Sequence, residues 1–192
     1  AAVGVAALNR DGFKARYSSF GPELAIATVG GDPISPDATE AWNNLADTGL
    51  VSLSNSGATA PDEPGYARVS GTSFSVPITA GVMGLMLSAY PEMTAEELRR
   101  GLEQSARPHV TSSQLAACSA LNPGRCLCST DTCGAGILDA DEAVRYAHTL
   151  RDQQPYVALP RSAAVVDSPE LEAAVASGND LPPNVAQPPR RS

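Results

Sequence analysis

A glycine-led serine segment that runs directly into a long apolar stretch constrains this chain more than any other feature. Residues 71–77 (GTSFSVP) precede residues 78–90 (ITAGVMGLMLSAY), whose composition predicts a helix buried in a core. Gly81 and Gly84 are expected to let that helix approach a neighbouring element closely. Ser73 is therefore expected at a helix N-terminus, where unpaired N–H groups and the positive dipole end stabilise a developing oxyanion.

This segment resembles the serine motif of the subtilases, the subtilisin-like serine endopeptidases, which is G-T-S-x-[SA]-x-P followed by a helix of small residues. Residues 17–24 (YSSFGPEL), 105–108 (SARP) and 132–140 (TCGAGILDA) resemble the same family, so the resemblance covers about residues 1–150. It implies an α/β fold that forms part of a three-layer subtilisin-like structure with a mostly parallel sheet. The alternative is an ordinary Ser/Thr-rich loop that caps a core helix.

The chain is expected to consist of a catalytic-domain segment, residues 1–151, and a Pro-rich tail, residues 152–192. Within the first segment, Trp42 is expected to pack down a polar surface insertion, or to form an exposed substrate platform. The Pro-rich tail is expected to be extended and partly packed, with its last dozen residues flexible. The expected elements are strands at 2–8, 25–29 and 49–53, the insertion at 31–48, helices from the capping residues Thr94 and Asp139, and a weak helix near 169–177.

By resemblance, Ser73 is the nucleophile that attacks the scissile carbonyl, and its own backbone N–H is one oxyanion-hole donor. The resemblance implies that Thr72 supports the oxyanion side through its hydroxyl. Ser70, Gly71 and Phe74 are candidate cleft residues. Phe74 stands where many subtilases carry Met, and would border the leaving-group side of the cleft.

Nothing in the chain supplies the rest of a catalytic triad. The subtilase order along the chain is Asp, His and then Ser, whereas His109 and His148 both follow Ser73 and are expected to be structural. The catalytic Asp, the catalytic His and the oxyanion-hole Asn would therefore lie before the first residue. We expect a C-terminal protease half, inactive alone, whose partners are the N-terminal half and a peptide or protein substrate. The opening inside an apolar strand pattern suggests a cut within a longer polypeptide.

Four cysteines fall within 16 residues, in a loop at 118–133. Their spacing, C-x7-C-x-C-x4-C, fits zinc sites poorly and favours two disulfides, although metal binding and free thiols remain alternatives. Four cysteines allow three pairings, of which we favour Cys118–Cys126 with Cys128–Cys133. Disulfides predict an oxidising compartment, so that the protein would be secreted or periplasmic.

Charge and composition exclude several partners. The net charge of −8 argues against nucleic acid, and the 17-residue apolar run from 74 to 90 contains Pro and Gly and is better explained by a core helix than by a membrane span. We expect that no cofactor is required and identify no metal ligand, while structural calcium remains possible but is not readable from this chain. Calcium commonly stabilises subtilases, but no D-x-[DN]-x-[DN]-G loop occurs. Tyr66 and Glu23 are weaker candidates for cleft or ion-site residues.

Two functions of different class follow. The first is a serine endopeptidase half that hydrolyses peptide bonds through an acyl-enzyme once joined to its N-terminal half. The alternative is a non-catalytic structural or inhibitory module derived from a subtilase, in which Ser73 is vestigial. The intact GTSFSVP segment favours the enzyme, because a module freed from catalysis does not need the hydroxyl.

Overall fold

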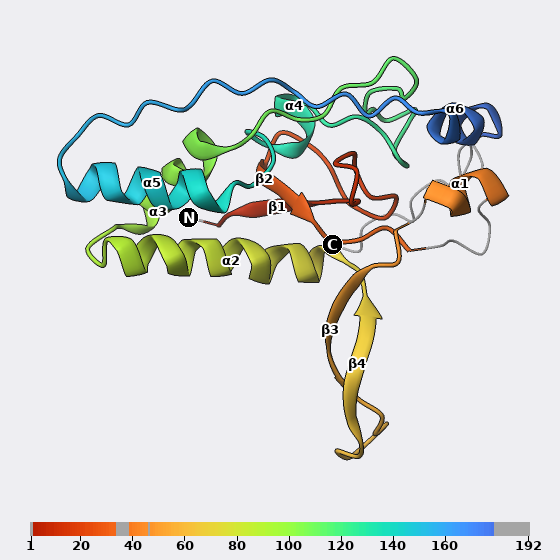
Figure 1. The fold of residues 1–192 in the computed structure, drawn as a ribbon, viewed down its shortest axis with the longest axis horizontal. Coiled ribbons are helices and arrows are strands. Elements are labelled where there is room, and N and C mark those ends of the chain that lie inside the picture. The colour runs from red at the N-terminus through yellow and green to blue at the C-terminus, as the bar shows by residue number, and fades with distance from the viewer. Residues whose placement is uncertain (1, 34–38, 46, 179–192) are drawn as a thin grey trace, which may run out of the picture.

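The computed structural model describes residues 2–33, 39–45 and 47–178 of the chain. The fold mixes helices and strands in an α/β arrangement, in which all four described strands precede helix α2 and only helices follow it (Figure 1). In chain order the elements are β1 (Gly4–Leu8), β2 (Leu24–Val29), α1 (Glu40–Leu45), β3 (Leu50–Asn55), β4 (Pro64–Val69), α2 (Thr72–Ala89), α3 (Ala95–Ser105), α4 (Thr130–Cys133), α5 (Ala140–Arg151) and α6 (Pro169–Ala176).

The two strands predicted at 2–8 and 25–29 form a parallel pair. β1 aligns with β2 from Gly4 opposite Leu24 to Leu8 opposite Val29. Helix α2 packs against both strands and against α5, while α3 and α4 pack on β2 (Figure 1). The main core is where these elements meet; it includes Ile26, Met86, Leu102, Tyr146 and Ala147.

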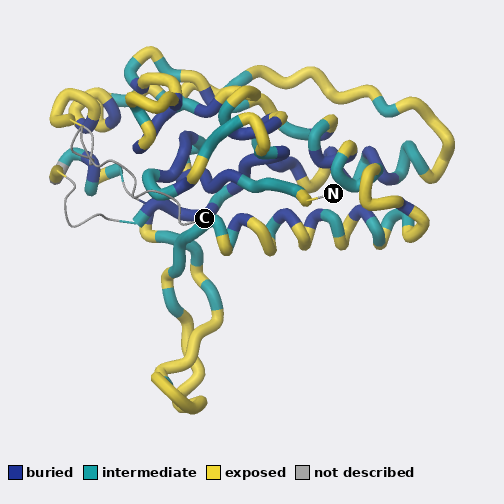
Figure 2. The backbone as a smooth tube through the Cα atoms, turned by 180° about the vertical axis from the view of Figure 1, so that it is seen from behind, coloured by how far each residue is buried: buried dark blue, intermediate teal, exposed yellow. Residues whose placement is uncertain are grey.

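The expectation that residues 49–53 join the parallel sheet is wrong. These residues fall in β3, which pairs with β4 in an antiparallel hairpin, from Leu50 opposite Val69 to Asn55 opposite Pro64. The hairpin projects from the body of the molecule (Figure 1), and its outer part is largely exposed (Figure 2). β4 pairs with the backbone groups along one edge of β3, and neither strand presents a buried face that would dock on a core.

Helix α2 is less buried than its composition predicts. Only Ser75, Thr79, Val82 and Met86 are buried, and their spacing of four, three and four residues defines a single stripe along the helix. The stripe faces the parallel strands and α5. By length and composition α2 could cross a membrane, but that is weak evidence, because core helices pass the same test.

The expected close approach of Gly81 and Gly84 to a neighbour is not found in the part of the chain that the structure describes. Both lie on the outward side of α2, exposed, and a Cβ added at either would meet nothing within 4 Å. The burial expected for this helix is therefore confined to one side.

The predicted helix starts at Thr94 and Asp139 are confirmed. The Thr94 hydroxyl accepts from the Glu97 N–H at 3.2 Å, and the Glu97 carboxylate accepts from the Thr94 N–H at 2.8 Å, which completes a capping box. Asp139 accepts from the Glu142 N–H at 3.1 Å at the start of α5.

The favoured disulfide pairing is also confirmed. Cys118 is bonded to Cys126, and Cys128 to Cys133, so no cysteine remains free. All four sulfurs are thus used in covalent bonds rather than as metal ligands. Two disulfides indicate that the chain folds in an oxidising compartment.

The tail crosses the surface and returns to the insertion at 31–48 (Figure 1). Thr111 donates to Ala164 O at 2.8 Å and accepts from the Val166 N–H at 3.0 Å, which ties the extended stretch down. α6 then packs on α1, where Trp42 is 1% exposed and its indole N–H donates to Gly178 O. Trp42 therefore anchors the insertion and is not an exposed platform. The expected flexible last dozen residues lie outside the described residues.

The single lysine, Lys14, is fully buried, and its ammonium donates to Ala15 O at 3.0 Å and to Ser18 O at 2.8 Å. Burial lowers the pKa of Lys14 to about 8, and nearby Asp32 only partly opposes this shift. Between that value and its unfolded pKa near 10.5, the folded state binds fewer protons than the unfolded state.

Lys14 should therefore contribute a rise in stability of about 2 kcal/mol between pH 7 and pH 10. Burial raises the pKa of Tyr17 and of Tyr156 to about 12, which opposes this rise near pH 10, so the Lys14 contribution is the difference from a variant without the amine. Urea unfolding at both pH values checks this expectation. A Lys14→Met variant should lack the rise, and an equal rise in that variant would show that another group titrates.

Candidate active site

Ser73 is the second residue of α2, and its side chain is exposed. The helix begins after Gly71, whose φ of 145° is open to glycine and rarely adopted by other residues. The Phe74 N–H donates to Gly71 O at 3.0 Å, which closes the turn. First-turn N–H groups such as those of Thr72 and Ser73 have no carbonyl four residues earlier in the helix, so they are directed outward. An exposed hydroxyl thus lies beside helix N-terminal donors.

Backbone and hydroxyl contacts hold this serine loop against residues 29–31, at the end of β2 and just after it. The Gly71 N–H donates to Gly30 O at 2.9 Å, and the buried Ser75 hydroxyl donates to Val29 O at 3.2 Å. The Tyr17 hydroxyl lies within hydrogen-bonding distance of the carbonyls of Gly30 (2.9 Å) and Gly31 (2.7 Å). A Cβ at Gly30 would lie 2.6 Å from the Ser75 hydroxyl, so only glycine permits the loop to sit this close.

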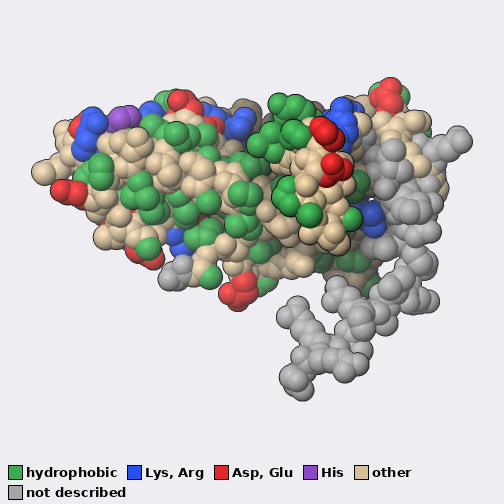
Figure 3. Space-filling model, turned by 90° about the horizontal axis from the view of Figure 1, so that it is seen from below, with side chains coloured by type: hydrophobic (Ala, Val, Ile, Leu, Met, Phe, Trp, Pro, Cys, Tyr) green, Lys and Arg blue, Asp and Glu red, His purple; other side chains and the backbone are tan. Residues whose placement is uncertain are grey.

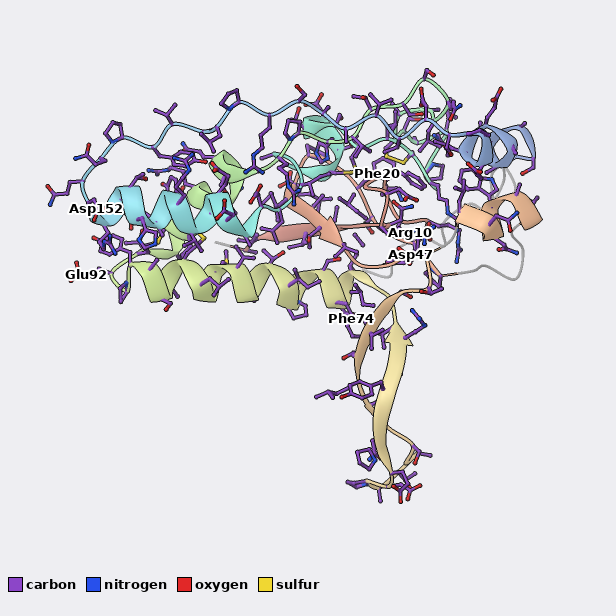
Figure 4. All side chains as sticks on the ribbon, viewed as in Figure 1. Arg10, Phe20, Asp47, Phe74, Glu92 and Asp152 are labelled. Carbon is purple, nitrogen blue, oxygen red and sulfur yellow. A yellow bond between two sulfur atoms is a disulfide. The ribbon has the colours of Figure 1, made fainter. Side chains whose placement is uncertain are left out.

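The other predicted site residues divide into two groups. Ser70, Gly71, Thr72 and Phe74 are half-buried in the same turn as Ser73, and Phe74 lies where α2 meets the hairpin (Figure 4).

Tyr66 and Glu23, the weaker candidates, are not brought into that turn. Tyr66 is 78% exposed on β4. Glu23 precedes β2, whereas the serine loop is seated beyond the end of that strand.

Neither histidine is near Ser73. The Nε2 atom of His109 lies 3.0 Å from Gly134 O, at the start of β2, whereas Gly71 bonds to Gly30 after its end; a strand of this length separates them by roughly 17 Å. Burial lowers the pKa of His109, which favours its neutral form.

His148 lies in the last turn of α5. Figure 4 places the neighbouring Asp152 at the opposite end of α2 from Phe74, and an 18-residue helix is about 27 Å long. Neither histidine is therefore placed to act as the base for Ser73 within this chain, and a structural role for both stays a prediction.

The sequence analysis missed a cluster of buried charged side chains next to the serine loop, residues 70–74. Asp32 and Asp47 are both buried, and Asp47 lies close to Arg10 (Figure 4), whose N–H donates to its carboxylate at 2.9 Å. Arg125 pairs with Asp32 at 2.5 Å from the disulfide loop. Burial raises the pKa of Asp32, and the Arg125 guanidinium opposes that shift. Asp32 after the Gly30-Gly31 turn was the available signal, but its partner is 93 residues away.

Known proteins place this arrangement in a family. The model of the Subtilase family, Peptidase_S8, matches residues 1–139. The extracellular protease of Xanthomonas campestris pv. campestris is 33% identical over 146 residues, which is 76% of this chain and 20% of that protein. The Aeromonas extracellular serine protease of Aeromonas sobria is 25% identical over 182 residues.

Solved structures of proteases have a similar fold. A protease of Pseudoalteromonas arctica PAMC 21717 superposes with a TM-score of 0.56 at 32% identity, over 76% of this chain and 35% of that one. The Aeromonas sobria serine protease, solved in complex with the chaperone ORF2, gives a TM-score of 0.51 at 25% identity, over 82% of this chain and 30% of that one.

The fold and the motif thus define a subtilisin-like α/β structure, and the chain belongs to the Subtilase family. The Aeromonas relative is named an extracellular serine protease, and the Xanthomonas relative an extracellular protease. The chain spans only 20% of the Xanthomonas protease and 29% of the Aeromonas protease.

Proposed function

We propose that this chain is the nucleophile-bearing part of an extracellular subtilisin-like serine endopeptidase. The observation that carries the proposal is the exposed Ser73 hydroxyl in the first turn of α2, in a loop clamped to the end of β2. A helix N-terminus favours negative charge next to that hydroxyl. Peptides and proteins are the proposed substrates.

In the proposed reaction, the Ser73 oxygen attacks the scissile carbonyl while a histidine base takes its proton. The Ser73 N–H donates to the resulting oxyanion, and Thr72 supports that side. The base then protonates the leaving amine, and water hydrolyses the acyl-enzyme. Phe74 would border the leaving-group side. Losing one oxyanion donor costs about 3–4 kcal/mol of transition-state stabilisation, so this chain alone should be essentially inactive.

We further propose that the N-terminal half of the same protease, which would carry the catalytic Asp and His and the oxyanion Asn, covers the outward side of α2. Val76 and Leu85 are 50% and 53% exposed there. Figure 3 shows hydrophobic side chains along this side of the molecule. Apolar surface of this kind gains free energy when it is removed from water.

A fluorophosphonate probe tests the nucleophile. It should label Ser73 in the complete protease and leave the 192-residue chain alone unlabelled, because serine reacts only beside a base. Ser73→Ala should abolish labelling without unfolding the protein, since the side chain is exposed. Intact-mass analysis and peptide mapping give the readout. Labelling at another serine would overturn the assignment, and labelling of the chain alone would mean that it contains its own base.

Alanine at Gly84 tests the proposed interface. In the chain alone, Gly84→Ala meets open space and should stabilise α2 by up to about 1 kcal/mol in urea unfolding. With the N-terminal half bound, the added methyl should weaken association. Gly101→Ala is the control, because its Cβ would lie 2.7 Å from the Tyr146 ring as well as 2.4 Å from the Met86 methyl, and should destabilise both forms. Unchanged association of the Gly84 variant would place the partner elsewhere.

A further inference from the structure

A buried ion pair lies directly behind the serine loop and ties it to the disulfide loop. Arg125 donates through Nε to the Asp32 carboxylate at 2.5 Å, and both side chains are 1% exposed. Asp32 directly follows Gly30 and Gly31, whose carbonyls lie within hydrogen-bonding distance of the Tyr17 hydroxyl. Gly30 O also accepts from the Gly71 N–H, two residues before Ser73.

Arg125 is fixed on its own side by two features. It lies inside the ring that the Cys118–Cys126 disulfide closes, directly before Cys126. Its guanidinium lies 5.0 Å from the centre of the Trp42 ring, over the indole. Trp42 is in turn buried against α6. The Arg125 guanidinium is therefore held in place by contacts that do not involve Asp32.

Hydrogen bonds and close packing couple the position of Asp32 to that of the serine loop. Its carboxylate accepts from the Arg16 N–H at 3.3 Å, and its own N–H donates to Asp47 at 2.7 Å. The preceding residue, Gly31, packs so tightly that a Cβ there would lie 3.2 Å from the Ser70 Cβ. A shift of Asp32 would therefore move the segment on which Ser70 and Gly71 rest.

Stability alone does not account for this pair. Burying two charges costs so much desolvation that a well-packed apolar pair of similar volume usually stabilises a protein equally well. An ion pair with directional hydrogen bonds does what an apolar pair cannot: it fixes the separation and orientation of two segments. Here those segments are the disulfide loop and residues 30–32, against which the serine loop packs.

We propose that Asp32 and Arg125 are positioning residues for Ser73, acting through Gly30, Gly31 and Ser70 to hold the nucleophile in its reactive placement. The proposal rests on the proposed function of Ser73. The disulfide Cys118–Cys126 then contributes to the reaction indirectly, because it restricts Arg125, which in turn positions Asp32.

The test uses the complete protease and compares Asp32→Asn with the double variant Asp32→Leu plus Arg125→Met. Asp32→Asn should lower kcat and the fluorophosphonate labelling rate at least tenfold with little change in KM, since small misplacements of reacting groups cost up to about a hundredfold in rate. The double variant should recover thermal stability without recovering the labelling rate. Recovery of both would show that the pair is only structural and would overturn the proposal.

Glu142→Gln is the matched control. Glu142 is a carboxylate that is 3% exposed and pairs with Arg145 at 2.6 Å, and its hydrogen bond to Tyr156 ties it to the tail. Its loss should lower stability and leave the labelling rate unchanged; a matching fall in rate would mean that any buried pair has this effect. If the unmodified protease fails to label, the proposed function falls. If it labels and Asp32→Asn labels equally fast, only the positioning role falls.

Discussion

Ending the chain after Gln153 is expected to lower the free energy of unfolding by at least about 3 kcal/mol. The tail contributes Leu171, 1% exposed, and Ala174, fully buried, to a cluster with Phe13 and Trp42. Its removal exposes that cluster and leaves the Trp42 indole N–H without its acceptor at Gly178. The tail is therefore expected to contribute to stability although it lies beyond the matched residues 1–139.

Chemical denaturation of the full and shortened chains measures this effect. Leu171→Ala should reproduce most of the loss, about 2–5 kcal/mol for a buried leucine. Glu172→Ala, on the exposed side of α6, should change stability by less than about 0.5 kcal/mol. Equal unfolding midpoints for the full and shortened chains would contradict the prediction.

Gly134→Ala is expected to destabilise the protein by more than about 3 kcal/mol, because two separate costs add at this position. Gly134 has a φ of +79°, which side-chain-bearing residues adopt at a cost of about 1–3 kcal/mol. A Cβ there would also lie 2.3 Å from the Ala25 carbonyl carbon and 2.5 Å from the Ile26 nitrogen. Those atoms belong to β2, so relief would require the strand to move away.

Gly21→Ala separates the two costs. Gly21 also has a positive φ, +151°, but a Cβ there meets nothing within 4 Å. Its substitution should therefore cost only the backbone strain. Thermal or urea unfolding of the two variants gives the comparison, and similar losses for both would show that the contact with β2 is relieved cheaply.

Local patterns in the sequence predicted much of the fold. The parallel strands, the serine at the start of α2, the capping box at Thr94 and the disulfide pairing all depend on residues close together in the chain. The hairpin was missed because residues 49–53 read equally well as a sheet strand, and β4 begins with Pro and Gly, which are depleted in strands. α1, with six residues, is too short to show a helical period.

Long-range features could not be predicted in the same way. Asp32 and Arg125 come together only after the disulfide loop folds against the end of β2, and no local pattern couples them. The burial of α2 was overestimated, because its apolar residues lie on every side whereas only one stripe finds a partner in the described chain. Composition alone does not say which side of such a helix is covered, or by what.

The two disulfides have a consequence for how this chain associates with other polypeptides. Each joins cysteines only eight or five residues apart, and together they use every thiol in the sequence. No free thiol is left to form a disulfide with a separate polypeptide. If the protease is nicked between its halves, denaturant without reductant should separate them. On a non-reducing gel the two pieces would then migrate as separate bands.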